Sequence, residues 1–160
     1  MVLTNSGSPT CTENLLPPPL SDFFTRWGVS FDELLGSFDL LTTGCQWIQR
    51  PIPTITGPQA ARRFLRLAHH TLGLTTIDVD IARTAVNGQT VFVERIDHLR
   101  RADGSTITSA PVVGTIEFID GRIVHWREYF DSLEFVGRAV KTGAVHGASS
   151  LIRRIARPCR

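Results

Sequence analysis

The stretch Ile77–Leu99, IDVDIARTAVNGQTVFVERIDHL, decides the fold of this 160-residue chain. Apolar and polar residues alternate in it on both sides of Asn87-Gly88, and successive side chains of a β-strand point to opposite faces. Asn-Gly between two alternating runs is the strongest short-range signal for a hairpin with a two-residue turn. The stretch therefore predicts two antiparallel strands, over residues 77–86 and 90–99.

The same pattern continues toward the C-terminus. Asp103-Gly104 predicts a turn into a third strand over residues 107–119, and Asp120-Gly121 predicts a turn into a fourth strand over residues 123–130. Strands that follow one another through tight turns pair with their neighbours in an antiparallel sheet. The second half of the chain is therefore expected to form an antiparallel meander.

On the N-terminal side of the hairpin, the apolar residues follow the period of a helix instead. A first helix is predicted after Ser21, a second from Ser30 through Leu41, and a third, opened by Pro58, from Gln59 to about Thr71. Helices followed by a run of strands are typical of the α+β class. We therefore predict an α+β fold.

The composition is that of an ordinary globular protein, with 42% hydrophobic and 20% charged residues. No apolar run approaches the ~20 residues of a membrane span, and the N-terminus lacks the features of a signal peptide. The three cysteines, Cys11, Cys45 and Cys159, are too far apart to suggest a disulfide framework or a metal cluster. The expectation is a cytoplasmic protein without a membrane partner, a metal or a cofactor.

Changes in composition divide the chain into three parts. Residues 1–20 are rich in Ser, Thr and Pro and are predicted to be a flexible leader, residues 21–137 form the folded domain, and residues 138–160 form a basic tail. No aromatic residues interleave with the arginines of the tail, as stacking on nucleic-acid bases would require. The tail is therefore expected to be a solvated appendage, with no nucleic-acid partner.

Arg95 and Asp97 are the first candidates for a functional site. They lie two residues apart on the second strand, on the face that also carries Val91. Charges on an apolar face cost several kcal/mol each unless their partners are close. Asp131 follows the fourth strand, so a shared sheet could place Arg95 between two aspartates.

Two carboxylates near one another do not both ionise easily, and apolar surroundings raise the pKa of the one with the poorer partner. A pair that shares one proton supplies an acid and a base at the same pH. Glu94 and Glu128 lie out of phase with Asp97 and Asp131 on their strands, so they are expected to face solvent or a second subunit.

Three segments resemble the limonene-1,2-epoxide hydrolase family of the NTF2-like, or SnoaL-like, superfamily. Phe92–Leu99 is similar to its Arg-x-Asp strand, Trp126–Asp131 to its second catalytic stretch, and Trp47–Pro53 to its Tyr-x-Asn-x-Pro-x-Pro run. The resemblance covers roughly residues 21–135. It implies an NTF2-like cone, in which a curved mixed or antiparallel sheet is wrapped by the N-terminal helices around a deep apolar pocket.

The resemblance also implies an activity, the addition of water to a small or bulky apolar epoxide to give a vicinal diol. In the family mechanism this is one step, without a cofactor or covalent intermediate. Carried over by resemblance, Asp131 is the general base on water, Asp97 the general acid on the epoxide oxygen, and Arg95 the bridge between the two carboxylates.

The chain departs from the family where Tyr and Asn help to hold the water, because Trp47 and Gln49 stand there. Gln49 keeps an amide, whereas Trp47 offers only an N–H donor and fills more space. Both are expected to position the water. If Trp47 instead displaces it, Asp131 acts on a hydroxyl of the substrate, which makes the enzyme an epoxide-opening cyclase or isomerase. The apolar substrate pocket is expected to include Phe38, Phe64 and Trp126.

Two other classes of function stay open at this stage. One is a proton-transfer enzyme of the ketosteroid isomerase or polyketide cyclase type, which needs one base and an oxyanion donor rather than two bridged carboxylates. The other is a non-catalytic binding module. We also predict a homodimer, because an open sheet with apolar residues on both faces exposes a large patch. Its interface is expected to contain Phe92, Ile96, Phe118 and Trp126.

Overall fold

The structure is a computed structural model that describes residues 16–131. Within that range the helices are α1 (Pro18–Trp27), α2 (Phe31–Ser37) and α3 (Gly57–Leu72), with a short 3₁₀ turn, η1 (Phe38–Leu40), after α2. The strands are β1 (Leu41–Gln49), β2 (Ile55–Thr56), β3 (Thr76–Asn87), β4 (Thr90–Arg100), β5 (Thr106–Ile119) and β6 (Arg122–Phe130). The predicted α+β class is confirmed.

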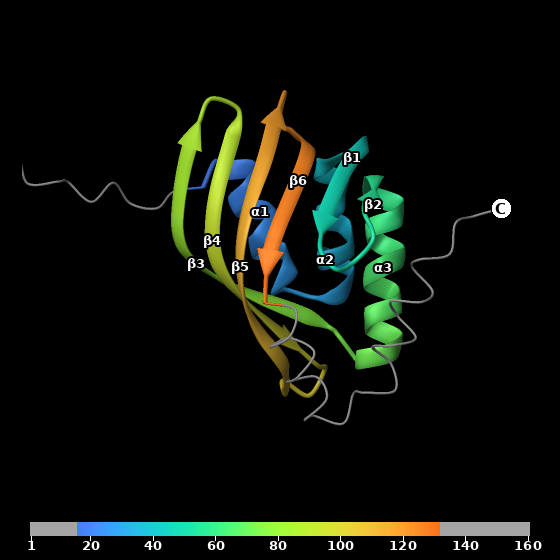
Figure 1. Ribbon diagram of the computed structural model, residues 1–160. Helices are drawn as coiled ribbons and strands as arrows, with labels where there is room; N and C mark the ends of the chain where they lie inside the picture. Colours follow the sequence, from blue (N-terminus) through green and yellow to red (C-terminus); the bar gives the residue numbers. More distant parts are fainter. Residues whose placement is uncertain (1–15, 132–160) are drawn as a thin grey trace, which may run out of the picture.

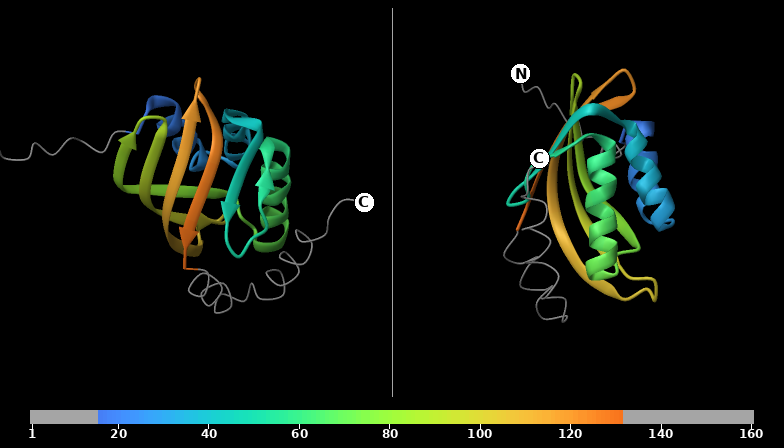
Figure 2. Two further views of the ribbon diagram at one scale, coloured as in Figure 1. Left: turned by 45° about the horizontal axis from the view of Figure 1, so that its top comes forward. Right: turned by 90° about the vertical axis from the view of Figure 1, so that its right-hand side faces the viewer.

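The strands form one six-stranded sheet in the order β2-β1-β6-β5-β4-β3 (Figure 1). Neighbouring strands are antiparallel, except that β1 runs parallel to β6. The sheet is curved, and the helices lie along its concave side (Figure 2). The strands β3 to β6 are the predicted meander, and β1 with β2 extends it into the mixed sheet that the resemblance implied.

The predicted turns are present, one of them shifted by a residue. The β3–β4 hairpin turns at Gly88-Gln89, because Asn87 pairs with Thr90 instead of entering the turn. The β5–β6 hairpin turns at Asp120 and Gly121, which both have positive φ, at 49° and 75°. Two positive φ values are the mark of the type I′ turn, whose twist matches that of the flanking strands.

The first helix begins before the predicted start of the domain. α1 starts at Pro18, within the expected leader, and Leu20 is fully buried in the core. Proline is well suited to the first turn of a helix, because the N–H that it lacks has no partner there. The prolines that suggested a leader therefore belong to a helix start.

The second helix is shorter than predicted. Ser30 caps α2, and its Oγ accepts a hydrogen bond from the N–H of Glu33 at 3.2 Å, as a helix cap requires. The helix ends at Ser37, however, and Leu41 begins β1 instead of ending a helix. In β1 the buried residues Cys45, Trp47 and Gln49 alternate with more exposed ones, which is the period of a strand.

The core between the helices and the sheet is built on aromatic rings. Trp47 of β1 and Trp126 of β6 stack with their centroids 4.5 Å apart and their planes 7° apart. Phe38 packs against both rings, at 5.5 Å from Trp47 and 6.2 Å from Trp126. This cluster therefore joins β1 to β6.

The opposite side of the sheet carries apolar residues that the helices do not cover. Phe92 and Ile96 of β4 are exposed there, with Val113 of β5 and Tyr129 of β6. Phe118 is only partly exposed and packs against the core. Trp126, the fourth residue of the predicted dimer interface, is fully buried in the aromatic cluster, so that part of the prediction is wrong. None of the helices within residues 16–131 is long and apolar enough to span a membrane.

Candidate active site

Arg95 is the centre of a buried cluster of charges on the concave side of the sheet. It lies on β4 in the alternating buried series Val91, Val93, Arg95 and Asp97, and it is 1% exposed. Its Nε donates to Oδ1 of Asp97 at 2.8 Å, and its Nη2 donates to Oδ2 at 3.0 Å. The predicted pair is therefore present as a two-pronged hydrogen-bonded ion pair, the strongest form that an arginine and a carboxylate can make.

The second carboxylate on Arg95 comes from Glu128 of β6. Nη2 of Arg95 donates to Oε1 of Glu128, and the indole Nε1 of Trp47 donates to Oε2 at 2.8 Å. Glu128 is 5% exposed. The expectation that it faces solvent or a second subunit is therefore wrong.

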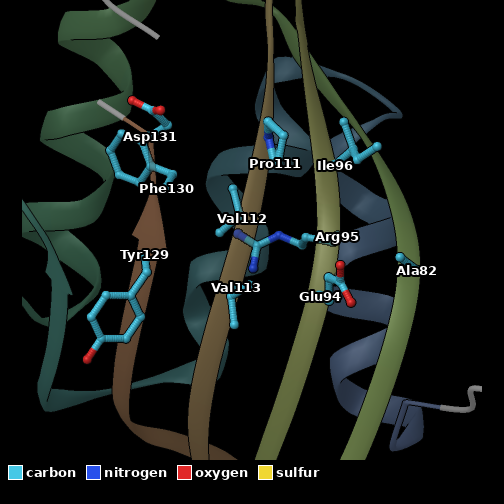
Figure 3. A pocket seen from close by; sticks show the side chains of 10 residues that line it. All are labelled: Ala82, Glu94, Arg95, Ile96, Pro111, Val112, Val113, Tyr129, Phe130 and Asp131. Atoms are coloured by element: carbon cyan, nitrogen blue, oxygen red, sulfur yellow. The ribbon is translucent and has the colours of Figure 1, made fainter. Parts of the chain in front are cut away.

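Asp131, the expected second carboxylate, is exposed and follows the last residue of β6. Figure 3 shows it at the end of that strand, while the side chain of Arg95 extends from β4 toward β5. Asp131 lines a shallow hollow of ≈ 430 Å³ together with Ile96, Val113 and Tyr129. The structure therefore corrects the expected geometry, because Glu128 takes the place beside Arg95 that was assigned to Asp131.

One signal in the sequence points to Glu128. Where a strand contains one tryptophan among charged residues, the large apolar ring of the tryptophan is the side chain most suited to the core. A side chain two positions away lies on the same face of the strand. Trp126 therefore places Glu128 on the inner face and sets Arg127, Tyr129 and Asp131 out of phase with it. The structure has this pattern, with Trp126 and Glu128 buried and the other three exposed.

Two aromatic rings of α1 cover the guanidinium. The Cζ atom of Arg95 lies 4.9 Å from the centre of the Phe24 ring and 5.8 Å from that of Trp27. A cation over an aromatic face is stabilised by the ring quadrupole, more so away from water. The rings of α1 therefore cover the Arg95 guanidinium and stabilise its charge.

The electrostatics of the cluster follow from its burial. Burial opposes the charge on Arg95, but the carboxylates of Glu128 and Asp97 outweigh that effect and raise its pKa further above neutrality. Burial also raises the pKa of Glu128, and the Arg95 guanidinium and the Trp47 N–H offset only part of that rise. The cluster thus holds one permanent cation and two carboxyl groups, one of which gives up its proton less readily than usual.

Gln49 and Trp47, the predicted water-positioning residues, both lie beside Glu128 but differ in what they contact. Gln49 pairs with Glu128 across β1 and β6 and is 6% exposed. Among residues 16–131, its amide nitrogen Nε2 is buried and has no hydrogen-bond partner. The side chain of Trp47 has one donor, its indole N–H, and this donates to Glu128.

The residues expected to line a substrate pocket belong to the aromatic core. Phe38 and Trp126 have no exposed surface. Phe64 of α3 is partly buried and meets the Trp47 ring edge to face at 5.7 Å. All three therefore contact the ring of Trp47, whose N–H donates to Glu128. Within residues 16–131, no group of three or more His, Cys, Asp or Glu side chains is arranged to hold a metal ion.

Comparison with solved structures places the fold. An LEH-like epoxide hydrolase of M. tuberculosis matches with a TM-score of 0.59 and 24% identity, over 86% of this chain and 94% of that one. A SnoaL-like polyketide cyclase from Jannaschia sp. CCS1 matches with a TM-score of 0.60 and 20% identity, over 80% and 90%. A ketosteroid isomerase-like fold from Catenulispora acidiphila, solved with trimethylamine, matches with a TM-score of 0.63 and 13% identity, over 79% and 95%. These likenesses establish the NTF2-like, SnoaL-like fold.

The sequence itself gives a narrower assignment. Residues 37–141 match the family model of the limonene-1,2-epoxide hydrolase catalytic domain. The match covers more than half of the chain and includes the three segments that carry Gln49, Arg95 and Glu128. The chain therefore belongs to the limonene-1,2-epoxide hydrolase catalytic domain family.

Proposed function

We propose that the protein is an epoxide hydrolase that adds water to an apolar epoxide and releases a vicinal diol. The observation that carries the proposal is the buried Arg95, hydrogen-bonded on one side to Asp97 and on the other to Glu128. Two carboxyl groups on one cation supply the acid and the base that a one-step opening needs. Membership of the family supports the assignment.

Glu128 is proposed as the base and Asp97 as the acid. Glu128 removes a proton from water as the water oxygen bonds to an epoxide carbon, and Asp97 gives its proton to the epoxide oxygen as the carbon–oxygen bond breaks. A proton then passes from Glu128 back to Asp97 to restore the starting state. Arg95 stays charged throughout and keeps both carboxyl groups in place.

The surroundings of each carboxyl group support these roles. Asp97, whose side chain is 11% exposed against 4% for Glu128, is the more accessible to a substrate oxygen. Glu128 accepts hydrogen bonds on both oxygens, which favours its ionised form and offsets part of the rise in pKa that burial causes. Its raised pKa makes that ionised form a stronger base toward water than an ordinary carboxylate.

Gln49 is proposed to hold the attacking water. Its amide nitrogen is a buried donor without a partner among the described residues, and the residue pairs with Glu128 across the sheet. A buried donor without a partner costs about 1–3 kcal/mol, which a bound water or substrate oxygen offsets. An amide also offers an acceptor for the second hydrogen of the water.

A second candidate function is an epoxide-opening cyclase, in which Glu128 takes the proton from a hydroxyl of the substrate. The observation that favours it is the hydrogen bond from the Trp47 N–H to Glu128. Because this N–H is already used, a water here has fewer hydrogen-bond partners than the Tyr and Asn of the family provide. The acid and base keep their roles, and only the nucleophile differs.

Turnover of a bulky cyclic apolar epoxide in ¹⁸O-labelled water tests the proposal. We expect one labelled oxygen in a vicinal diol with the wild-type protein, and product formation about 10²–10⁴-fold slower with Asp97→Asn. An unlabelled cyclic ether from a hydroxy-epoxide would establish the cyclase instead. Absence of turnover across a panel of epoxides, with and without a hydroxyl, would contradict both.

A further inference from the structure

The side-chain N–H of Trp47 is directed at the candidate base, Glu128. Its indole Nε1 lies 2.8 Å from Oε2 of Glu128, and the two residues are 81 positions apart in the chain. The other oxygen of Glu128 accepts from Arg95. Each carboxylate oxygen therefore has one fixed donor, and the plane of the carboxylate is set from both ends.

The ring that carries this donor is held on several sides. Trp126 stacks on it at 4.5 Å, Phe64 meets it edge to face at 5.7 Å, and Phe38 packs against it at 5.5 Å. Trp47 as a whole is 5% exposed. A donor on a packed ring cannot turn away from its acceptor without displacing its neighbours.

We propose that Trp47 is a positioning residue for the base, and that its indole N–H holds Glu128 in the ionised form and in the orientation that receives a proton from the nucleophile. This inference rests on the proposed function and deepens it. It separates two tasks that the family resemblance gave jointly to Trp47 and Gln49. Trp47 acts on the base, and Gln49 alone is left to contact the water.

The chemistry of indole supports this division. A Trp N–H donates one hydrogen bond and accepts none, so once it is directed at Oε2 it has nothing to offer a water. A hydrogen bond to the charged form of an acid lowers its pKa, and the Trp47 N–H acts on Glu128 in that direction, against burial. Removal of this donor should therefore make Glu128 harder to ionise.

The test compares two substitutions that make the same chemical change. Trp47→Phe removes the N–H directed at Glu128 and keeps an aromatic ring against Trp126. Trp126→Phe removes an indole N–H that is buried without a hydrogen-bond partner among residues 16–131. The quantity measured is the pH midpoint of the Glu128 carboxyl, by carbon NMR of protein labelled at the glutamate carboxyl carbon and assigned with Glu128→Gln.

We expect Trp47→Phe to move this midpoint up by about one pH unit, the size expected for loss of a hydrogen bond to a charged group. Trp126→Phe should leave it in place. The acid limb of the pH profile of kcat/KM should move with the carboxyl midpoint in Trp47→Phe. No change in the midpoint in Trp47→Phe, or an equal change in both variants, would overturn the inference.

The NMR measurement does not depend on turnover, so it separates this inference from the proposed function. Suppose that the wild-type protein opens no epoxide. A midpoint that moves only in Trp47→Phe would still show that the Trp47 N–H stabilises ionised Glu128, and only the proposed role in catalysis would be contradicted. If turnover is found but its acid limb does not follow the carboxyl midpoint, the positioning role in catalysis is overturned.

A measurement on the unsubstituted side chain guards against failure of Trp47→Phe to fold. The chain has three tryptophans, so ¹⁵N-indole labelling gives three side-chain signals to follow. One of them should titrate together with the Glu128 carboxyl, and that titration should vanish in Glu128→Gln. If none of the three indole signals changes its chemical shift as Glu128 ionises, the inference is overturned, and no substitution of Trp47 is needed for that result.

Discussion

The guanidinium of Arg95 lies over Gly114, so close that a Cβ built on Gly114 would be 3.3 Å from Nη1. Gly114 belongs to β5, which separates the strand of Arg95 from the strand of Glu128, and it pairs directly with Glu128. A glycine inside a strand often marks the close approach of another group. Here it leaves room for Arg95 to cross a strand and reach its second carboxylate.

Gly114→Ala should therefore lower kcat/KM, because the added methyl pushes the guanidinium away from Glu128 by a few tenths of an ångström. We expect a loss of about tenfold, less than the ~10²-fold that a full 1 Å misplacement costs. Gly44→Ala is the control, since a Cβ there meets nothing within 4 Å. Equal effects of the two substitutions on steady-state kinetics would contradict this account of Gly114.

Asp97→Asn and Glu128→Gln should each lower kcat by about 10²–10⁴-fold, because each removes one end of the proposed proton transfer. Asp131→Asn should leave kcat within about twofold of the wild type, since Asp131 is exposed and Glu128 occupies the place beside Arg95. Kinetics with one epoxide substrate compare the three variants. A large loss in Asp131→Asn with an active Glu128→Gln would return the role of base to Asp131.

Arg95→Lys should lower kcat by at least about 10²-fold. A lysine keeps the charge, but one ammonium cannot form the two-pronged pair with Asp97 and also reach Glu128. Arg83→Lys is the matched control, because Arg83 is an exposed arginine of the neighbouring strand that pairs with Glu94. Wild-type kinetics in Arg95→Lys would mean that only the charge of Arg95 matters.

The raised pKa of Glu128 predicts a pH-dependent difference in stability between the wild type and Glu128→Gln. Because burial raises the pKa in the folded state, the folded protein binds this proton more tightly than the unfolded chain does. The wild type should therefore lose stability relative to Glu128→Gln as the pH rises from about 4.3 through the folded-state pKa.

Each unit by which folding raises the pKa corresponds to about 1.4 kcal/mol of this difference. Urea unfolding of both proteins at several pH values between 4 and 8 measures it. A gap that stays constant would show that the neighbours of Glu128 balance its burial, and a gap that moves in favour of the wild type with rising pH would show that they outweigh it.

The uncovered side of the sheet predicts a homodimer. Val113 of β5 is 50% exposed and lies among the exposed apolar residues Ile96 and Tyr129. We expect light scattering at micromolar concentration to give about twice the chain mass of 17.7 kDa for the wild type, and a monomer for Val113→Glu. Val29→Glu, at an exposed apolar residue outside the sheet, should leave the dimer intact. A monomeric wild type would end this proposal.

Local patterns in the sequence were sufficient for four of the strands and for one half of the site. The runs around Gly88 and Gly121 specify hairpins through their own turn chemistry, and the i, i+2 spacing of Arg95 and Asp97 places both on one face. Neither conclusion needs knowledge of a distant segment. Both are present in the structure.

The remainder depended on contacts between distant segments. β1 contains Gly44, a residue type that is depleted in strands, and its register with β6 shifts between Leu41 and Gln46. The register between β5 and β6 also shifts, at Glu117 and Phe118 of β5. Such irregularities break the period of two early in β6, so alternation applies only from Trp126 onward, where the stacking of this ring on Trp47 of β1 fixes the inner face.

The separation of the site residues along the chain has a consequence for the order of folding. Arg95 and Asp97 are two positions apart, Arg95 and Glu128 are 33 apart, and Trp47 and Glu128 are 81 apart. Contacts between near neighbours close small loops and form early, whereas distant pairings wait for the whole topology. During synthesis Arg95 and Asp97 emerge well before Glu128. We therefore expect the cluster of Arg95, Asp97 and Glu128 to be completed in the last step of folding, when β6 enters between β1 and β5.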